Sequence, residues 1–220
     1  MLQRVLEPEV MDSAEEAAAY DAMQHGEVNR QFVDDLLEAA SWKGRVLDLG
    51  TGTAQIPIEL CRRARECEVL GIDMSVNMLN LGQSNVEAAR LSDRVTLERV
   101  DAKQLPYPDQ TFSAVISNSI VHHIAQPQVV LAEAIRVTRQ GGTLFWRDLL
   151  RPTDDSAVNG LVHRYAANEN PHQRQLFDDS LRAALSLNEI RAIVAELGFD
   201  PMGVHTTSDR HWTWIVRLGE

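Results

Sequence analysis

Residues 45–54 read Arg-Val-Leu-Asp-Leu-Gly-Thr-Gly-Thr-Ala, and this stretch decides the fold. Its first half is a short apolar run of the kind that forms a central parallel strand buried on both faces. Gly50 and Gly52 then permit backbone dihedral angles that side chains disfavour, and they leave room for a ligand to touch the main chain. The stretch therefore predicts a strand, a tight turn that binds a nucleotide-like ligand, and a helix.

The same turn disfavours two common nucleotides. A dinucleotide-binding turn needs a further glycine three residues after Gly52, and Gln55 stands there instead. A phosphate-binding loop ends in Gly-Lys-Ser/Thr, and no lysine follows Gly52 in this turn. Asp48 lies two residues before Gly50 and places a carboxylate at the mouth of the turn. A carboxylate repels phosphate and favours an ammonium or sulfonium ligand.

Residues 46–54 resemble the first motif of the class I S-adenosylmethionine-dependent methyltransferases, with Ala54 where that motif usually has its third glycine. The resemblance implies a doubly wound, Rossmann-like α/β sheet of seven strands, mostly parallel with the last strand antiparallel. It also implies S-adenosylmethionine as the cofactor. The cofactor-binding residues of this motif would be Asp48, Gly50, Thr51 and Gly52.

An acidic residue ends the next predicted strand, Val69 to Asp73. Asp73 comes 21 residues after Gly52, close to the spacing at which a carboxylate meets the two hydroxyls of a ribose. We therefore expect Asp73 to bind the ribose, and Met74 beside it to be a further cofactor-binding residue. The alternative is an acid that only caps the following helix, which begins after Ser75.

A second acidic segment follows the third predicted strand. Asp101-Ala102, followed by the proline-punctuated stretch 105–113, resembles the methyltransferase segment in which an acid and the next amide hold the adenine. The resemblance implies that Asp101 and Ala102 bind the adenine amino group and ring nitrogen. The alternative is an ordinary loop carboxylate.

The fourth predicted strand ends at Asn118, and the histidine pair His122-His123 follows it. The run resembles the His-His segment of quinone-type and other small-molecule methyltransferases, where this edge of the sheet borders the methionine moiety, here near Asn118, and the acceptor. We expect one histidine to be packed and the other to line the pocket. His122, His123 and Asp148 are the candidate proton acceptors. We expect no metal site, because adjacent histidines rarely coordinate one ion and no third ligand lies at helical spacing.

The rest of the chain predicts one methyltransferase domain over residues 1–220. Residues 1–43 are expected to form N-terminal helices, 44–148 the cofactor-binding core, 149–185 a helical cap, and 186–220 a helix and a hairpin. In the core, we expect a helix over 127–139 stopped by Gly141-Gly142 and a strand over 143–148; the hairpin strands are expected at 199–204 and 211–218. The resemblance implies that the cap and the leading helix wall the acceptor pocket, with Tyr20 facing the cofactor. A solvated helix and a ligand-free cap are the alternatives.

Composition limits the partners and the location. The formal net charge of −11 disfavours a nucleic-acid partner, because phosphate binding needs clustered Lys and Arg. No apolar run approaches the ~18 residues of a membrane span, and the first residues lack the apolar core of a signal peptide, so we expect a cytoplasmic protein. Cys61 and Cys67 have no metal-ligand spacing around them and are expected to be buried free thiols.

These features together predict S-adenosylmethionine-dependent methyl transfer to a small-molecule acceptor by in-line displacement. Two alternatives remain open from the sequence. One is a protein that binds S-adenosylmethionine or S-adenosylhomocysteine without transferring a methyl group. The other is a nicotinamide oxidoreductase, which Gln55 disfavours.

Overall fold

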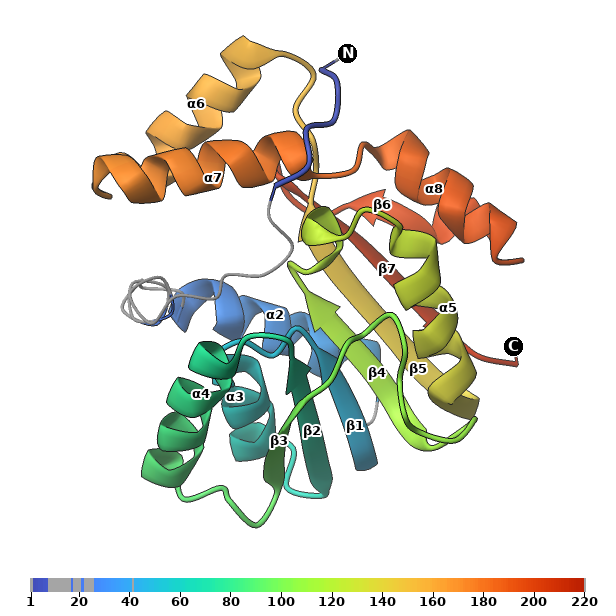
Figure 1. Cartoon of the computed structure of the whole chain (residues 1–220). Coiled ribbons are helices and arrows are strands. Elements are labelled where there is room, and N and C mark those ends of the chain that lie inside the picture. The colour runs from blue at the N-terminus through green and yellow to red at the C-terminus, as the bar shows by residue number, and fades with distance from the viewer. Residues whose placement is uncertain (1, 8–16, 18–20, 22–25, 41, 220) are drawn as a thin grey trace. The chain divides into compact units, whose positions relative to one another are not determined.

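The computed structural model describes residues 2–7, 17, 21, 26–40 and 42–219 (Figure 1). The chain divides into two compact units. The first contains residues 1–9, 119–128 and 146–214, and the second contains residues 10–118, 129–145 and 215–220. Two strands, Thr138–Leu149 and His211–Arg217, contribute residues to both units.

Seven strands form one mixed sheet in the order β3-β2-β1-β4-β5-β7-β6. Strand β1 pairs in parallel with both β2 and β4, β2 pairs in parallel with β3, and β6 and β7 pair in an antiparallel hairpin. The predicted doubly wound sheet with an antiparallel last strand is therefore confirmed. The bounds of the strands are β1 Gly44–Leu49, β2 Cys67–Asp73, β3 Val95–Arg99, β4 Phe112–Asn118, β5 Thr138–Leu149, β6 Val204–Thr206 and β7 His211–Arg217.

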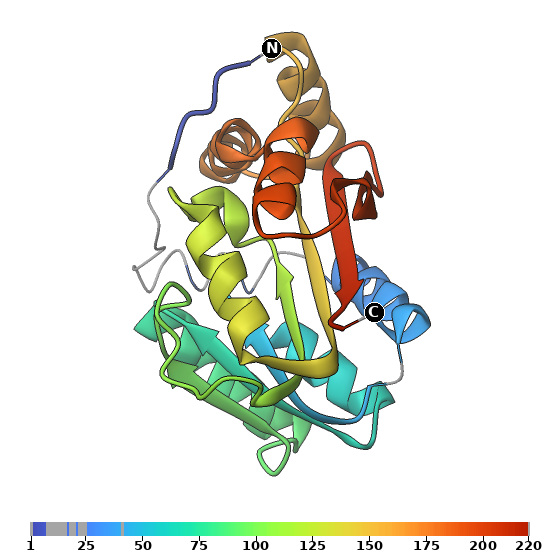
Figure 2. The same ribbon diagram turned by 90° about the vertical axis from the view of Figure 1, so that its right-hand side faces the viewer.

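In the second unit, helices alternate with the parallel strands. Helix α3 joins β1 to β2, α4 joins β2 to β3, and α5 joins β4 to β5. Because such crossovers are right-handed, α5 lies on the opposite face of the sheet from α3 once the strand order reverses, as Figure 2 shows. The bounds of the helices are α2 Gly26–Ala39, α3 Gln55–Arg63, α4 Val76–Ala89 and α5 Pro127–Val137.

The strand order reverses between β1 and β4, and in open α/β sheets ligands bind beyond the carboxyl ends of the strands at this point. Strand β1 is anchored there by a continuous core of α2, α3 and the sheet, which includes Phe32, Val46 and Ile116. Phe32 also stacks edge-on against Phe145, with ring centroids 5.1 Å apart. The loop that follows β1 therefore starts from a rigid strand.

The first unit is mostly helical, as predicted for residues 149–185. Helices α6 Asp155–Tyr165 and α7 Pro171–Ala183 pack together around Val158, Leu161 and Leu181. Helix α8 Leu187–Glu196 begins with a capping box of Ser186 and Glu189 and packs on β6. The unit also contains two short 3₁₀ turns, η1 Val121–His123 and η2 Pro201–Gly203.

Two predicted boundaries are wrong. Helix α5 ends at Val137, and Gly141 and Gly142 lie inside β5 rather than at a helix stop. The backbone there needs glycine, because Gly141 has a φ of +70° and a Cβ on Gly142 would lie 2.8 Å from the carbonyl oxygen of Arg139. The strand predicted at 199–204 begins only at Val204, since the Asp200 side chain caps the turn η2.

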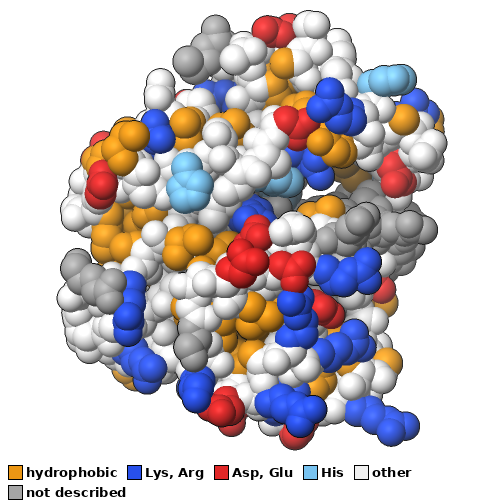
Figure 3. Space-filling model, turned by 180° about the vertical axis from the view of Figure 1, so that it is seen from behind, with side chains coloured by type: hydrophobic (Ala, Val, Ile, Leu, Met, Phe, Trp, Pro, Cys, Tyr) orange, Lys and Arg blue, Asp and Glu red, His pale blue; other side chains and the backbone are white. Residues whose placement is uncertain are grey.

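Other expectations are met or fall outside the described residues. Cys61 and Cys67 are buried free thiols. Of the predicted leading helix, only Ala17 and Asp21 are described, and Tyr20 lies outside the described residues. No helix in the described part of the chain combines the length and apolar character needed to cross a bilayer. On the face drawn in Figure 3, acidic and basic side chains are interspersed.

Candidate functional site

The turn after β1 is held against β2 by its backbone. The amides of Gly50 and Thr51 both donate to the carbonyl oxygen of Ile72, each at 2.9 Å. Gly71 makes room for the turn, because a Cβ there would lie 2.5 Å from Thr51 Oγ1. Thr51 is itself buried. The main chain of the turn is thus held in place by contacts within the protein.

Three residues of the turn adopt the left-handed conformation that favours glycine. Gly50 and Gly52 have φ values of +72° and +53°, as their sequence spacing predicts. Ala54, which replaces the usual third glycine, has a φ of +63° and is the N-terminal cap of α3. The backbone geometry of the glycine motif is therefore kept, with the steric strain of a β-carbon at its third position.

Asp73 is bonded directly to this turn. Its Oδ2 accepts a hydrogen bond from the Gly52 amide at 2.9 Å, and its Oδ1 accepts one from the Ser75 amide at 2.9 Å. Burial raises the pKa of Asp73, although these amides favour the ionised form. Each carboxylate oxygen keeps a second lone pair that can accept a hydrogen bond from a ligand hydroxyl.

Asp48 is a buried carboxylate near the end of β1, with 2% of its surface exposed. Burial raises the pKa of Asp48 to about 7, and the charge of Asp73 adds to this effect. A cationic ligand beside Asp48 would favour its ionised form and would itself be favoured by it. The site is therefore poised for a positively charged group rather than a phosphate.

Asp101 and Ala102 lie just beyond β3. The Asp101 Oδ1 accepts a hydrogen bond from the Lys103 amide at 2.8 Å, and Lys103 Nζ lies 3.4 Å from the same oxygen. The Val100 amide donates to the carbonyl oxygen of Asp73, so the ends of β2 and β3 are joined. Ala102 is buried.

The remaining predicted cofactor residues also lie at strand ends. Met74 follows the last residue of β2, and Asn118 is the last residue of β4. Strands β4 and β1 are joined near their carboxyl ends by a hydrogen bond of 3.1 Å from the Ser117 hydroxyl to the Leu49 carbonyl oxygen. The predicted cofactor residues other than Tyr20 thus lie in the second unit, at the carboxyl edge of the sheet.

The chemistry of these residues fits S-adenosylmethionine. Asp48, Asp73 and Asp101 offer acceptors for the hydroxyl, amino and ammonium groups of such a ligand, and they would repel the phosphates of a dinucleotide. Gln55, where a dinucleotide site has glycine, is used structurally: its amide nitrogen lies 3.1 Å from Asp21 Oδ1. Asp21 also accepts a hydrogen bond from Asn85 on α4 at 3.0 Å. Sequence reasoning missed these hydrogen bonds of Asp21, because the partners are far apart in the chain.

The candidate proton acceptors come together in the first unit. The Nδ1 of His122 lies 2.6 Å from Asp148 Oδ1, and both side chains are buried. Asp148 Oδ2 also accepts the Val121 amide at 2.6 Å. His123 is partly exposed, with its ring centroid 4.1 Å from that of His122. The prediction that one histidine is packed is confirmed.

The pKa values of this group reflect the pairing of His122 with Asp148. Burial alone would raise the pKa of Asp148, but the positive charge of His122 and two backbone amides outweigh it, so the pKa is lowered. Burial would lower the pKa of His122, but Asp148 and Glu7 outweigh it, so that pKa is raised. Asp148 is therefore a poor proton acceptor and instead orients the His122 ring.

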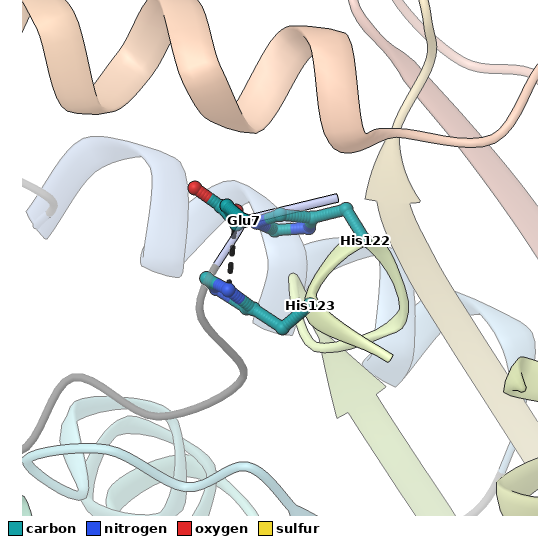
Figure 4. A group of neighbouring side chains, drawn as sticks. All are labelled: Glu7, His122 and His123. Atoms are coloured by element: carbon teal, nitrogen blue, oxygen red, sulfur yellow. Dashed lines mark ion pairs between the residues drawn. The ribbon is translucent and has the colours of Figure 1, made fainter. Parts of the chain in front are cut away.

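Glu7 is the member that sequence reasoning missed. Its Oε1 lies 3.5 Å from His122 Nε2 and 3.1 Å from His123 Nδ1, and Figure 4 shows the three side chains converging. Burial raises the pKa of Glu7, against the opposing effects of His122 and Ser180. No local pattern marks Glu7, because its partners lie more than a hundred residues away in the chain.

The sequence is similar to known methyltransferases. Residues 46–142 match the family model described as a methyltransferase domain. The ubiquinone/menaquinone biosynthesis C-methyltransferase UbiE of Geobacter sulfurreducens is 25% identical over 189 residues, 78% of this chain and 72% of that protein. The demethylmenaquinone methyltransferase of Deinococcus radiodurans is 35% identical over 164 residues, 74% of this chain and 60% of that protein. The chain thus spans less than two thirds of the second relative's length.

A solved structure supports the fold. The putative S-adenosyl-L-methionine-dependent methyltransferase of Methanococcus maripaludis matches with a TM-score of 0.73 and covers 98% of both chains. Its sequence identity to this chain is only 15%, so this likeness bears on the fold alone.

Proposed function

This chain belongs to the class I S-adenosylmethionine-dependent methyltransferases, and from that premise we propose that it transfers a methyl group from S-adenosylmethionine to a small-molecule acceptor. The observation that carries the proposal is the turn after β1, in which the Gly52 amide is bonded to Asp73 and the buried Asp48 lies at the end of the strand. A cytoplasmic location, and an acceptor other than a nucleic acid, are parts of the same proposal. The net charge of −11 supports the second part.

Each carboxylate has one role in this proposal. Asp73 accepts hydrogen bonds from the ribose hydroxyls through the lone pairs that Gly52 and Ser75 leave open. Asp101, with the buried Ala102 beside it, reads the adenine. Asp48 holds the positively charged methionine end through the turn that it precedes. Tyr20, which lies outside the described residues, and the strand-end residues Met74 and Asn118 complete the set.

The chain contributes binding and orientation more than bond chemistry. When bound, S-adenosylmethionine supplies a methyl group attached to a positive sulfur, and transfer removes that charge. A site that aligns an acceptor with the methyl group and excludes water supplies much of the acceleration. The main chain of residues 50–52 serves this purpose, since hydrogen bonds to Ile72 and Asp73 hold it in place.

The names of the relatives suggest which acceptor to try first. The proteins from Geobacter sulfurreducens and Deinococcus radiodurans are named for quinone and demethylmenaquinone methylation. We propose a small ring compound of this kind as the first acceptor to assay. A protein that binds the cofactor without transferring methyl is the alternative, and only an acceptor assay separates the two.

The experiment has two stages. Calorimetric titration with S-adenosylmethionine and S-adenosylhomocysteine is expected to show binding of both, with no binding of NAD. Asp73→Asn should weaken cofactor binding by about 1 to 3 kcal/mol, because an amide accepts fewer and weaker hydrogen bonds from the hydroxyls. Asp93→Asn, at an exposed position, is the matched control and should bind as the wild type does. Equal affinities in the two variants would refute the ribose assignment.

The second stage follows the methyl group. Radiolabelled S-adenosylmethionine is incubated with the protein and demethylmenaquinone, and label is measured in the extracted acceptor. Label in the acceptor supports the proposal. Cofactor binding without label in this or any other small acceptor of a screened set would favour the binding-protein alternative.

A further inference from the structure

Glu7, His122 and His123 form a cluster of three metal-ligand side chains in the first unit (Figure 4). Each offers one ligand atom, and these atoms all lie within 4.8 Å of one another. Glu7 Oε1 is the atom nearest to His122 Nε2 and His123 Nδ1 among the ion pairs of the cluster. We propose that these three residues bind a divalent transition-metal ion, of which zinc is the best match in ligand type. The pair of histidines alone did not predict a site; the third ligand comes from the N-terminal segment.

The two separations that involve the Glu7 oxygen suit a metal. Zinc binds imidazole nitrogen and carboxylate oxygen at about 2.0 to 2.2 Å, so neighbouring ligand atoms lie about 3.4 Å apart in a tetrahedron and about 3.0 Å apart in an octahedron. The Glu7 oxygen lies 3.5 Å from His122 Nε2 and 3.1 Å from His123 Nδ1. Both distances are those of atoms that share one ion.

Asp148 presets the tautomer that a metal requires. Its Oδ1 lies 2.6 Å from His122 Nδ1, and an ionised carboxylate only accepts, so Nδ1 carries the hydrogen. In the neutral ring, the lone pair is then on Nε2, the nitrogen that faces Glu7. Metal-binding histidines usually have a carboxylate or carbonyl on the nitrogen away from the metal.

The carboxylate ligand has an outer partner as well. Glu7 is held by the Ser180 hydroxyl, which lies 3.1 Å from Oε1 and 3.2 Å from Oε2. Arg4, on the same segment, donates to the carbonyl oxygens of His122 and Ile124 at 3.2 and 3.0 Å, so it secures the segment to the histidine turn. Both ends of the cluster are therefore positioned by groups that are not ligands.

An ion pair without a metal is the competing arrangement. A proton on His122 would place an imidazolium between Asp148 Oδ1, 2.6 Å from Nδ1, and Glu7 Oε1, 3.5 Å from Nε2. That arrangement leaves His123 as a second imidazole facing the same Glu7 oxygen. One ion engages all three side chains at once, and three protein ligands leave a coordination position open for water or an oxygen of a small molecule.

The test measures metal binding without the cofactor, so its failure would leave the methyltransferase proposal untouched. The full chain, without an affinity tag, is treated with a chelator and titrated with Co²⁺ by absorption spectroscopy and with Zn²⁺ by calorimetry. We expect one equivalent of each to bind, with the Co²⁺ spectrum showing nitrogen and oxygen ligands. His123→Ala and Glu7→Gln should each weaken Zn²⁺ binding by at least about 10-fold.

His163→Ala is the matched control, because His163 is exposed on α6, away from the cluster in the chain. It should bind Zn²⁺ as the wild type does. Circular dichroism checks that His123→Ala, at a partly exposed position, is folded. Glu7→Gln tests the loss of Zn²⁺ binding independently of His123→Ala. The proposal would be overturned if both variants bound Zn²⁺ with the affinity of the wild type. It would also be overturned if the wild type bound no equivalent of either metal. A thiolate-to-cobalt charge-transfer band would do so too, because it would place the ion at the cysteines.

Discussion

Asp48 is a single residue whose charge couples folding to pH. Its pKa is about 7 in the folded chain, against about 3.9 when exposed, so between these values the folded state keeps a proton that the unfolded state releases. Stability contributed by this group is therefore present at low pH and is lost as the pH rises through this window. The slope is up to about 1.4 kcal/mol per pH unit.

Asp48→Asn should remove this dependence. We expect the free energy of unfolding of the variant, measured relative to the wild type by urea unfolding, to be higher at pH 8 than at pH 5. Asp93→Asn, at an exposed position, should follow the wild type at both pH values. Parallel behaviour of Asp48→Asn and wild type would mean that Asp48 is ionised in the folded chain throughout.

Single residues near the turn were predictable in position. The spacing from Gly52 predicted that Asp73 meets a ribose beyond the second strand; the hydrogen bond from the Gly52 amide shows that Asp73 lies against the turn, and ribose binding stays a prediction. This prediction works because a short strand, a tight turn and a helix span a nearly constant number of residues. Glu7 was not predictable, since only the folded chain brings it to His122.

Arg4 makes several hydrogen bonds that attach the N-terminal segment, residues 2–7, to the first unit. Arg4 Nε donates to the carbonyl oxygen of Ala183, the last residue of α7, at 2.6 Å. Its guanidinium also donates to carbonyl oxygens around η1. Neighbouring backbone amides add to this tie: Leu2 donates to Thr153 and Val5 to Arg182. Burial lowers the pKa of Arg4, but an arginine remains protonated, so these bonds persist at all ordinary pH values.

Arg4→Ala should lower the free energy of unfolding by about 1 to 3 kcal/mol, because it leaves partly buried carbonyl oxygens without their donor. Arg4→Lys should be intermediate, since an ammonium cannot fork to the same acceptors. Arg174 is exposed on α7, the helix that Arg4 contacts, and Arg174→Ala should change stability by less than about 0.5 kcal/mol. Urea unfolding midpoints measure the stability of all three variants. Equal midpoints for Arg4→Ala and Arg174→Ala would contradict the stabilising role of the Arg4 hydrogen bonds.

Elements with local start signals were predicted well. Ser75 caps α4, and Ser186 with Glu189 forms the capping box of α8, as their spacing indicates. The start of β5 was not predicted, because Gly141-Gly142 after an apolar helix is the usual pattern of a helix stop. The glycines instead let the strand pass closely by neighbouring backbone, which no local pattern reveals.

For the whole molecule, the resemblance of residues 46–54 to the methyltransferase motif predicted the sheet, and short connections between parallel strands leave few other topologies. The division of the chain was not predictable in the same way. The compact units are built from interleaved segments, so their limits follow from tertiary contacts rather than from composition.

Because β5 and β7 each run from one compact unit into the other, we expect the chain to unfold in one transition. Melting either unit would remove strand residues from the sheet of the other. In scanning calorimetry, the calorimetric and van't Hoff enthalpies should therefore agree. S-adenosylhomocysteine at 100 times its dissociation constant should stabilise the fold by about 2.7 kcal/mol and shift this entire transition upward, whereas NAD should not. Two transitions, with only one moved by the ligand, would show that the units unfold independently.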